Sequence, residues 1–277
     1  MAINSNCPSD AWKDRIKLHR ENMTMINIGA NSGSNANEFL LRHDPSWNVQ
    51  PDIGHKEAQM GCGACGACHS IVPRASAARG GVRSIRIIAV ELLLLNFVSL
   101  KRTFDNFKVP GIALHAAAGS HMGMTHEPKV YESGVEHEGV SEIGIPIPII
   151  TVDALHSIFH LPSTVDVLSI DTEGNDPLVL EGAMEGIKRK AYRVIEFEYH
   201  GVGAWKRHSL NETVRSKLTA YGYRCFWQGN DGSLSEFDFT CNYEFHGWSN
   251  IVCTHEPRVL SVMEEMCIDH ASIARVT

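Results

Sequence analysis

Four polar side chains at the ends of two apolar segments are of the types that acid–base chemistry needs. Asp171 and Glu173 directly follow the apolar run 165–170, and Glu198 and His200 close the next such run. If that second run is a strand, its alternation turns Glu198 and His200 to the same side. Carboxylates and imidazole can take a proton from a weak nucleophile such as a hydroxyl. These four residues are therefore candidate catalytic residues, with Asp171 as the best candidate for the base.

The same cluster allows two other interpretations. Carboxylates and imidazole also bind divalent cations that orient a substrate. Alternatively, the four side chains form a hydrogen-bond framework that holds a cofactor and its loops in place. We favour the framework, because polar residues around a site more often hold other groups in position than take part in the reaction. We assign no metal ligand, and a role for a divalent metal stays open.

A glycine turn earlier in the chain suggests a nucleotide site. An apolar run ends at Gly29, and Gly33 follows just before residues with helical spacing. Glycine lets the backbone turn sharply and approach a ligand. The turn differs from the dinucleotide pattern, because Asn31 and Ser34 replace its second and third glycines. Glu91 ends the next apolar run, where a carboxylate can accept hydrogen bonds from both ribose hydroxyls of an adenosine cofactor.

These residues need a scaffold that brings the ends of distant segments together. Apolar runs alternate with helical patterns along the chain, which predicts an α/β fold with a mostly parallel sheet. The expected strands are 24–29, 85–91, 112–118, 165–171, 194–199, 223–228 and 249–253. Ligands bind outside the carboxyl ends of the strands in such a sheet. The candidate residues all fall at or near those ends.

Composition limits the partners. The 277 residues carry a formal net charge of −7 and no long basic run, which disfavours nucleic acid or an anionic membrane. The most apolar stretch, 87–100, is interrupted by Glu91 and Asn96 and is too short to span a bilayer. The N-terminal residues contain no apolar signal-peptide core. We therefore expect a cytoplasmic protein whose cysteines are mostly reduced.

Residues 44–83 differ in composition from the rest and predict an inserted loop rich in cysteine and glycine. Cys62, Cys65 and Cys68 have the spacing that starts a ferredoxin-type cluster motif, followed by His69. However, Val72 stands where a fourth cysteine is needed. Zinc would need a second pair of ligands from elsewhere in the chain. We favour a surface loop without metal, and a metal or redox role remains the alternative.

The segment 166–183 carries the most specific pattern in the chain. It resembles the FkbM family of methyltransferases, with an apolar strand, Asp171, a Glu-Gly pair, an acid and a Leu-x-Gly-Ala ending. Other landmarks of that family also occur, in the family's order along the chain: 28–31 with Gly33, 89–91, 116–118 with Gly123, 151–155 and 194–198. Three positions depart from the family pattern. Asn27 stands where the family has an aspartate, and Ser169 stands where it has a lysine. Asp176 stands where it has a glutamate, and a helix-capping role would be a sufficient structural reason for an acid at this position.

The resemblance implies a Rossmann-like class I methyltransferase fold, with seven strands and helices on both faces of the sheet. It implies S-adenosylmethionine as cofactor, and a hydroxyl of a small molecule or glycan as acceptor. Transfer to nitrogen and the oligomeric state stay open. The implied cofactor-binding residues are Asn27, Gly29, Asn31, Gly33, Glu91, Ala117 and Asp171. The expected domain spans 21–260, between an N-terminal extension (1–20) and a C-terminal tail (261–277).

Two other functions compete with methyl transfer. A nicotinamide-dependent oxidoreductase uses a similar sheet, but the missing third glycine and the segment 171–174 argue against it. A non-enzymatic, thiol-rich metal-binding or interaction protein on a methyltransferase scaffold is the other alternative. The replacements at Asn27 and Ser169 keep it open.

Overall fold

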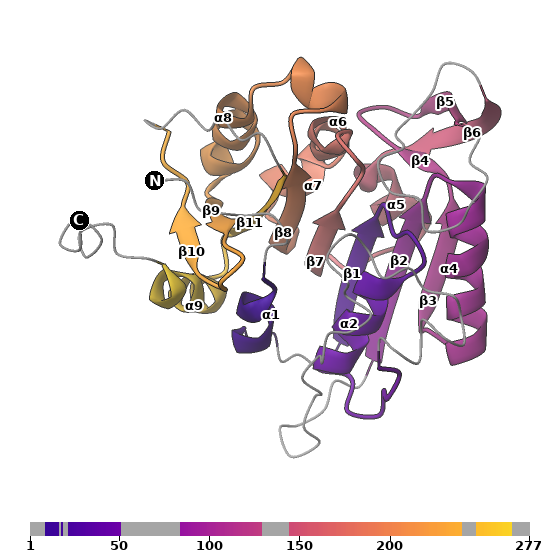
Figure 1. Ribbon diagram of the computed structural model, residues 1–277, viewed down its shortest axis with the longest axis horizontal. Coiled ribbons are helices and arrows are strands. Elements are labelled where there is room, and N and C mark those ends of the chain that lie inside the picture. The colour runs from indigo at the N-terminus through magenta and orange to yellow at the C-terminus, as the bar shows by residue number, and fades with distance from the viewer. Residues whose placement is uncertain are drawn as a thin grey trace.

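The centre of the computed structural model is an eight-stranded sheet in the order β10-β9-β11-β8-β7-β1-β2-β3 (Figure 1). The structure describes residues 9–16, 18, 22–50, 84–128, 144–239 and 248–267. The strands of this sheet are β1 (Asn22–Ile28), β2 (Ser84–Glu91), β3 (Gly111–His115), β7 (Val165–Ile170), β8 (Tyr192–Tyr199), β9 (Arg224–Gln228), β10 (Leu234–Glu236) and β11 (Ser249–Thr254). A second sheet contains β4 (Ala117–Ala118), β6 (Ile145–Ile150) and β5 (Gly123–Glu127), in that order.

The main sheet is mostly parallel. β1 pairs in parallel with β2 and β7, and the outer strands β3 and β8 continue this direction. β11 runs antiparallel to both β8 and β9, and β10 runs antiparallel to β9. The predicted α/β architecture is confirmed, but the expected number of seven strands is wrong. The additional strand β10 has three residues, too few to show the alternation by which a strand is recognised in a sequence.

Helices cover both faces of the sheet, as expected (Figure 1). One face packs against α5 (Val152–Ile158), α6 (Asp176–Glu181), α7 (Met184–Lys188) and α8 (Leu210–Thr213), which continues as a π-helical turn, η4 (Val214–Leu218). The opposite face packs against α1 (Ala11–Arg15), α2 (Ser34–His43), α4 (Leu94–Phe107) and α9 (Pro257–Met266). The strands between these layers are buried on both faces, which is why they read as nearly continuous apolar runs.

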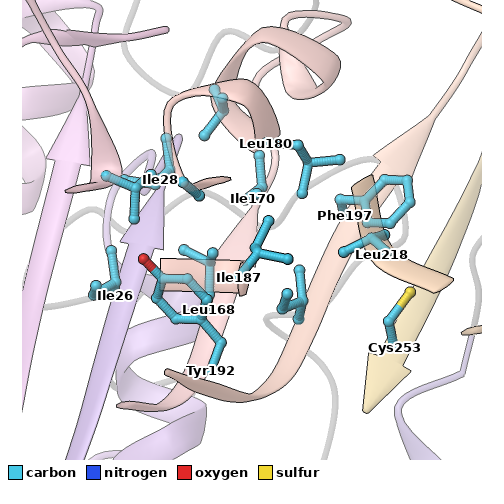
Figure 2. Packing of buried hydrophobic residues seen from close by; sticks show 14 of the residues in the cluster. Ile26, Ile28, Leu168, Ile170, Leu180, Ile187, Tyr192, Phe197, Leu218 and Cys253 are labelled. Carbon is cyan, nitrogen blue, oxygen red and sulfur yellow. The ribbon is translucent and has the colours of Figure 1, made fainter. Parts of the chain in front are cut away.

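The two faces of the central strands supply two separate parts of the core. Ile26 and Ile28 of β1 pack with Leu168 and Ile170 of β7 on one face, where Ile187 of α7 covers them (Figure 2). The apolar side chains of Met23 and Met25 of β1 and of Val167 of β7 pack on the opposite face. Each such side chain is almost inaccessible to solvent, and its burial stabilises the fold by about 2 kcal/mol.

The order of strands reverses at β1. The chain continues from β1 to β2 and β3 on one side, and the later strands β7 and β8 lie on the other side. At such a switch point the connections leave in opposite directions and open a crevice at the carboxyl ends of the strands. The fold therefore offers a ligand site where β1 and β7 end.

The first helix belongs to the core. Trp12 of α1 is 1% exposed and packs in the same cluster as Met263 of α9. Residues inside the predicted N-terminal extension therefore contribute to the fold, and α9 crosses the predicted boundary at residue 260. The domain boundaries themselves remain predictions.

The expectation of mostly reduced thiols is wrong for one buried pair. Cys225 of β9 and Cys253 of β11 lie directly opposite each other and form a disulfide. Disulfides persist in oxidising compartments, so the cysteines no longer support a cytoplasmic location. Cys267 is a free thiol. The cysteines of the expected inserted loop lie in 51–83, outside the described residues.

Within the described ranges, no helix combines the length and the apolar character that crossing a membrane requires.

Candidate functional site

The glycine turn after β1 has the backbone that a ligand loop requires. Gly29 and Gly33 have φ values of +75° and +100°, and Asn31 between them has a φ of +46°. A Cβ atom on Gly29 would lie 1.6 Å from the backbone oxygen of Asp171, so only glycine fits there. Asn31 occupies a left-handed conformation that costs energy for a residue with a side chain. Such strain at the end of a central strand is typical of a functional turn.

Glu91 lies beside this turn, as predicted. Its Oε2 accepts a hydrogen bond from the backbone N–H of Asn31 at 2.8 Å, and its Oε1 accepts one from Leu93 at 2.8 Å. Burial raises the pKa of the Glu91 carboxyl to about 7, against the effect of these hydrogen bonds. Each carboxylate oxygen has two lone pairs, so both can still accept a hydroxyl of a bound ribose. The turn and the acid are therefore joined by a direct hydrogen bond.

A second buried acid next to Glu91 was missed by the sequence analysis. Glu127 of β5 is 3% exposed and accepts a hydrogen bond from the backbone N–H of Leu94 at 3.1 Å. Its Oε2 also lies 2.9 Å from Nε2 of His115, and Phe97 stacks on that imidazole ring. Glu127 falls in a stretch without a clear period, so no signal in the sequence pointed to it.

Asn27 lies in β1 two residues before Gly29 and is completely buried. Neither its Nδ2 nor its Oδ1 has a hydrogen-bond partner among the described residues. A buried polar group without a partner costs about 1–3 kcal/mol, so it is a site where a bound polar molecule is favoured. This orphaned amide fits a polar cofactor beside the turn.

Ala117, another predicted cofactor residue, is buried in β4 and pairs with Ile149. The carbonyl oxygen of its neighbour Ala118 accepts a hydrogen bond from Nδ2 of Asn175 at 2.7 Å. This bond ties β4 to the loop after β7, and thus to the predicted acid cluster.

The predicted acid cluster is brought together at the carboxyl ends of β7 and β8. Nε2 of His200 lies 2.9 Å from Oε2 of Glu198 and 3.4 Å from Oε2 of Glu173. Asp171 directly follows β7, and its backbone N–H donates to the oxygen of Ile28 at 2.9 Å. All four predicted catalytic residues therefore lie at one edge of the sheet, beside the glycine turn.

Close contact between two loops explains why Glu173 reaches His200. Gly174 follows Glu173 with a φ of +95°, and a Cβ atom on it would lie 2.8 Å from the backbone oxygen of Val202. The oxygen of Gly174 accepts a hydrogen bond from the N–H of Ala204 at 2.8 Å. The loop after β7 thus lies directly on the loop after β8. Glycine at 174 is required by this approach.

Electrostatics separates the roles of Asp171 and His200. Residue Asp171 is exposed, and desolvation of its carboxyl together with the nearby carboxylates, Glu198 foremost, raises its pKa well above the usual range. Desolvation lowers the pKa of His200, but contact with Glu173 and Glu198 outweighs it and raises the pKa to about 10. The two carboxylates therefore favour the protonated form of His200. Asp171 is the accessible carboxyl of the cluster.

Asp176 has a different role from the capping one that the sequence suggested. Asn175 is the N-cap of α6, and Asp176 begins the helix. The fully buried carboxyl of Asp176 accepts hydrogen bonds from the hydroxyl of Thr172 at 3.0 Å and from the backbone N–H of Glu198 at 3.2 Å. Burial and the nearby Glu198 raise its pKa to about 7. Asp176 therefore positions Glu198 within the cluster.

Comparison with known proteins identifies the family. The model of the methyltransferase FkbM domain matches residues 15–225. No curated protein is similar enough to count as a match.

Among solved structures, a methyltransferase FkbM from Methylobacillus flagellatus KT is 12% identical, with a TM-score of 0.46 over 85% of this chain. This chain spans 45% of that protein. A precorrin-6y C5,15-methyltransferase from Geobacter metallireducens is 11% identical, with a TM-score of 0.39, covering 89% of this chain and 85% of that one.

Proposed function

The chain belongs to the FkbM family of methyltransferases, and we propose that it transfers the methyl group of S-adenosylmethionine to a hydroxyl oxygen of a small molecule or glycan. The observation that carries the proposal is the position of Asp171. Its backbone packs against Gly29 of the cofactor turn, and its exposed carboxyl belongs to the acid cluster. The same residue therefore adjoins both the expected methyl donor and the groups that can receive the acceptor's proton.

The cofactor, when bound, supplies a sulfonium-activated methyl group. The residues of this chain would hold it by the 29–33 turn and by Glu91, whose carboxylate accepts the ribose hydroxyls. The side-chain amide of Asn27, which has no hydrogen-bond partner among the described residues, would form a hydrogen bond with the polar end of the cofactor or with a water beside it. The task of the protein is then to hold the acceptor oxygen in line with the methyl group.

The acceptor's proton has a defined route in this proposal. A hydroxyl is a weak nucleophile, and a base within hydrogen-bond distance assists the transfer as the proton leaves. Asp171 in its ionised form is the group that takes it, because it is the exposed carboxyl of the cluster and directly follows β7 beside the turn. Glu173, Glu198 and Asp176 act on Asp171 through their negative charge, which raises its affinity for that proton.

The first experiment is calorimetric binding of S-adenosylhomocysteine to the full chain, with NAD as a competing candidate ligand. We expect Glu91→Ala to weaken binding by about 1–3 kcal/mol, as for the loss of a buried charged acceptor. Glu265→Ala is the matched control, because Glu265 lies on the surface of α9. No binding of S-adenosylhomocysteine by the folded wild type would refute the proposal, and binding of NAD instead would favour the oxidoreductase.

A further inference from the structure

Three possible ligand atoms, from Glu173, Glu198 and His200, lie close to one another. One carboxylate oxygen of each glutamate and a ring nitrogen of His200 all lie within 4.8 Å of one another. Metal–ligand bonds to such atoms are about 2.0–2.2 Å, so atoms on opposite sides of one ion are about 4 Å apart. We propose that these three residues form a binding site for one divalent cation.

Two buried atoms of the cluster make no hydrogen bond and could share a cation. Oε2 of Glu198 and Nε2 of His200 are buried and have no hydrogen-bond partner in the part of the chain that the structure describes. They face each other as an ion pair at 2.9 Å, although their orientation does not meet that of a hydrogen bond. An ion between them would satisfy both atoms at once. The imidazole also distinguishes this cluster from the groups of acids that are common on protein surfaces.

The backbone holds the ligands before any ion arrives. The contact of Gly174 with Val202 fixes the loop that carries Glu173 against the loop that carries His200. Asp176 fixes the backbone at Glu198. Because these ligands are already in place, binding a metal would not require the entropy loss of ordering two loops.

The charge of the cluster also favours a cation. Carboxylate oxygens of Glu173 and Glu198 lie together around the ring of His200, at 3.4 Å and 2.9 Å from its Nε2. A divalent ion would displace the imidazolium proton and neutralise two of the carboxylates. Carboxylates suit Mn²⁺ and Mg²⁺, whereas imidazole suits Zn²⁺ and Fe²⁺. Mn²⁺ accepts both ligand types, and we take it as the probe.

The ion would lie next to Asp171. If the proposed methyl transfer holds, the ion can bind the acceptor oxygen and make its hydroxyl more acidic. The preferred acceptors would then carry a second oxygen near the reacting hydroxyl, because two adjacent oxygens can chelate one cation. This extension rests on the proposed function, whereas the ion site itself does not.

The test is titration of Mn²⁺ into the metal-stripped full chain, followed by the electron paramagnetic resonance signal of free Mn²⁺. Mn²⁺ prefers oxygen and nitrogen ligands, so the cysteine-rich segment competes little. We expect one Mn²⁺ per chain, and an affinity at least about tenfold weaker in Glu198→Gln and in His200→Gln, which corresponds to about 1.4 kcal/mol. His208→Gln is the matched control, since His208 contacts Glu181 outside the cluster.

Two outcomes would overturn the site: no Mn²⁺ binding by the wild type, or equal affinity in all variants. If Glu198→Gln fails to fold, Glu173→Gln replaces it, because Glu173 lies in a loop. Binding of S-adenosylhomocysteine is measured on the same samples. Cofactor binding without Mn²⁺ binding rejects only the metal site, and Mn²⁺ binding without cofactor binding rejects only the methyltransferase proposal.

Discussion

Replacing Glu91 by glutamine should change how the stability of the protein depends on pH. Burial raises the pKa of Glu91 from 4.5 to about 7. One pKa unit corresponds to 1.36 kcal/mol, so the shift corresponds to roughly 3 kcal/mol. The folded state therefore binds the proton of Glu91 more tightly than the unfolded state. The stabilisation from this proton is complete below pH 4.5 and is lost as the pH rises through 7.

Urea unfolding of wild type and Glu91→Gln between pH 4.5 and 8 measures this effect. The amide cannot titrate, so wild type should lose about 3 kcal/mol relative to the variant over this range. A constant difference between the two arises from the lost hydrogen bond to Asn31 or Leu93 and does not affect the slope. Glu265→Gln, at an exposed position of α9 that contacts Arg15, is the control for a Glu-to-Gln change away from the site. If the free energies of unfolding of wild type and Glu91→Gln differ by the same amount at every pH, the reasoning is refuted.

Cofactor binding should depend on pH in the opposite direction. The ribose hydroxyls donate to the ionised carboxylate, so ionisation of Glu91 favours binding. The affinity for S-adenosylhomocysteine should rise as the pH increases from 6 to 8, and this rise should disappear in Glu91→Gln. An affinity that does not change with pH would remove Glu91 from the proposed ribose site.

Three further predictions concern the scaffold. Gly29→Ala would place a Cβ atom 1.6 Å from a facing carbonyl oxygen at a left-handed backbone position. Calorimetry should then detect no cofactor binding, and urea unfolding should show that the free energy of unfolding falls by more than about 1 kcal/mol. Gly201→Ala, with open space around it, is the control. The disulfide of Cys225 and Cys253 joins residues 28 positions apart, so replacing both by serine should lower the free energy of unfolding by roughly 3–4 kcal/mol, and an unchanged melting temperature would contradict this. Trp12→Ala should lower the free energy of unfolding, measured in urea, by about 3–5 kcal/mol, because Trp12 is 1% exposed. A decrease below about 1 kcal/mol would show that α1 contributes little to the stability of the fold.

The sequence was sufficient wherever a local pattern carried the information. The strands between the helical layers are buried on both faces, so their apolar runs were visible, and the polar residues that end them marked the edge where ligands bind. Gly29 was identifiable because a sharp turn after a strand needs glycine. Glu91 and Asp171 were identifiable because each ends an apolar run.

Contacts between distant parts of the chain could not be predicted in this way. Cys225 and Cys253 meet because β9 and β11 pair in one particular register, which no local pattern specifies. Glu127 reaches the neighbourhood of Glu91 through the small second sheet. The role of Asp176 depends on the backbone of Glu198, 22 residues further on, whereas local spacing suggested only a helix cap.

The two departures from the family pattern that bear on charge are neighbours in space. Asn27 of β1 and Ser169 of β7 are partners in the parallel register, so their side chains share one face of the sheet. Both residues are buried. An aspartate at position 27 and a lysine at position 169 would therefore be neighbours in the core, where opposite charges can pair. Losing only one of them would leave an unpaired buried charge, which costs about 3–5 kcal/mol.

This pairing predicts strong coupling between the two positions. Asn27→Asp alone and Ser169→Lys alone should each destabilise the fold, and the double variant should be more stable than their sum by about 1–3 kcal/mol, measured by urea unfolding. The extra volume of the lysine is present in the single and the double variant, so it cancels in the cycle. Additive effects would mean that the two side chains do not interact. Coupling would show that charges at the two positions interact directly in the core of this protein.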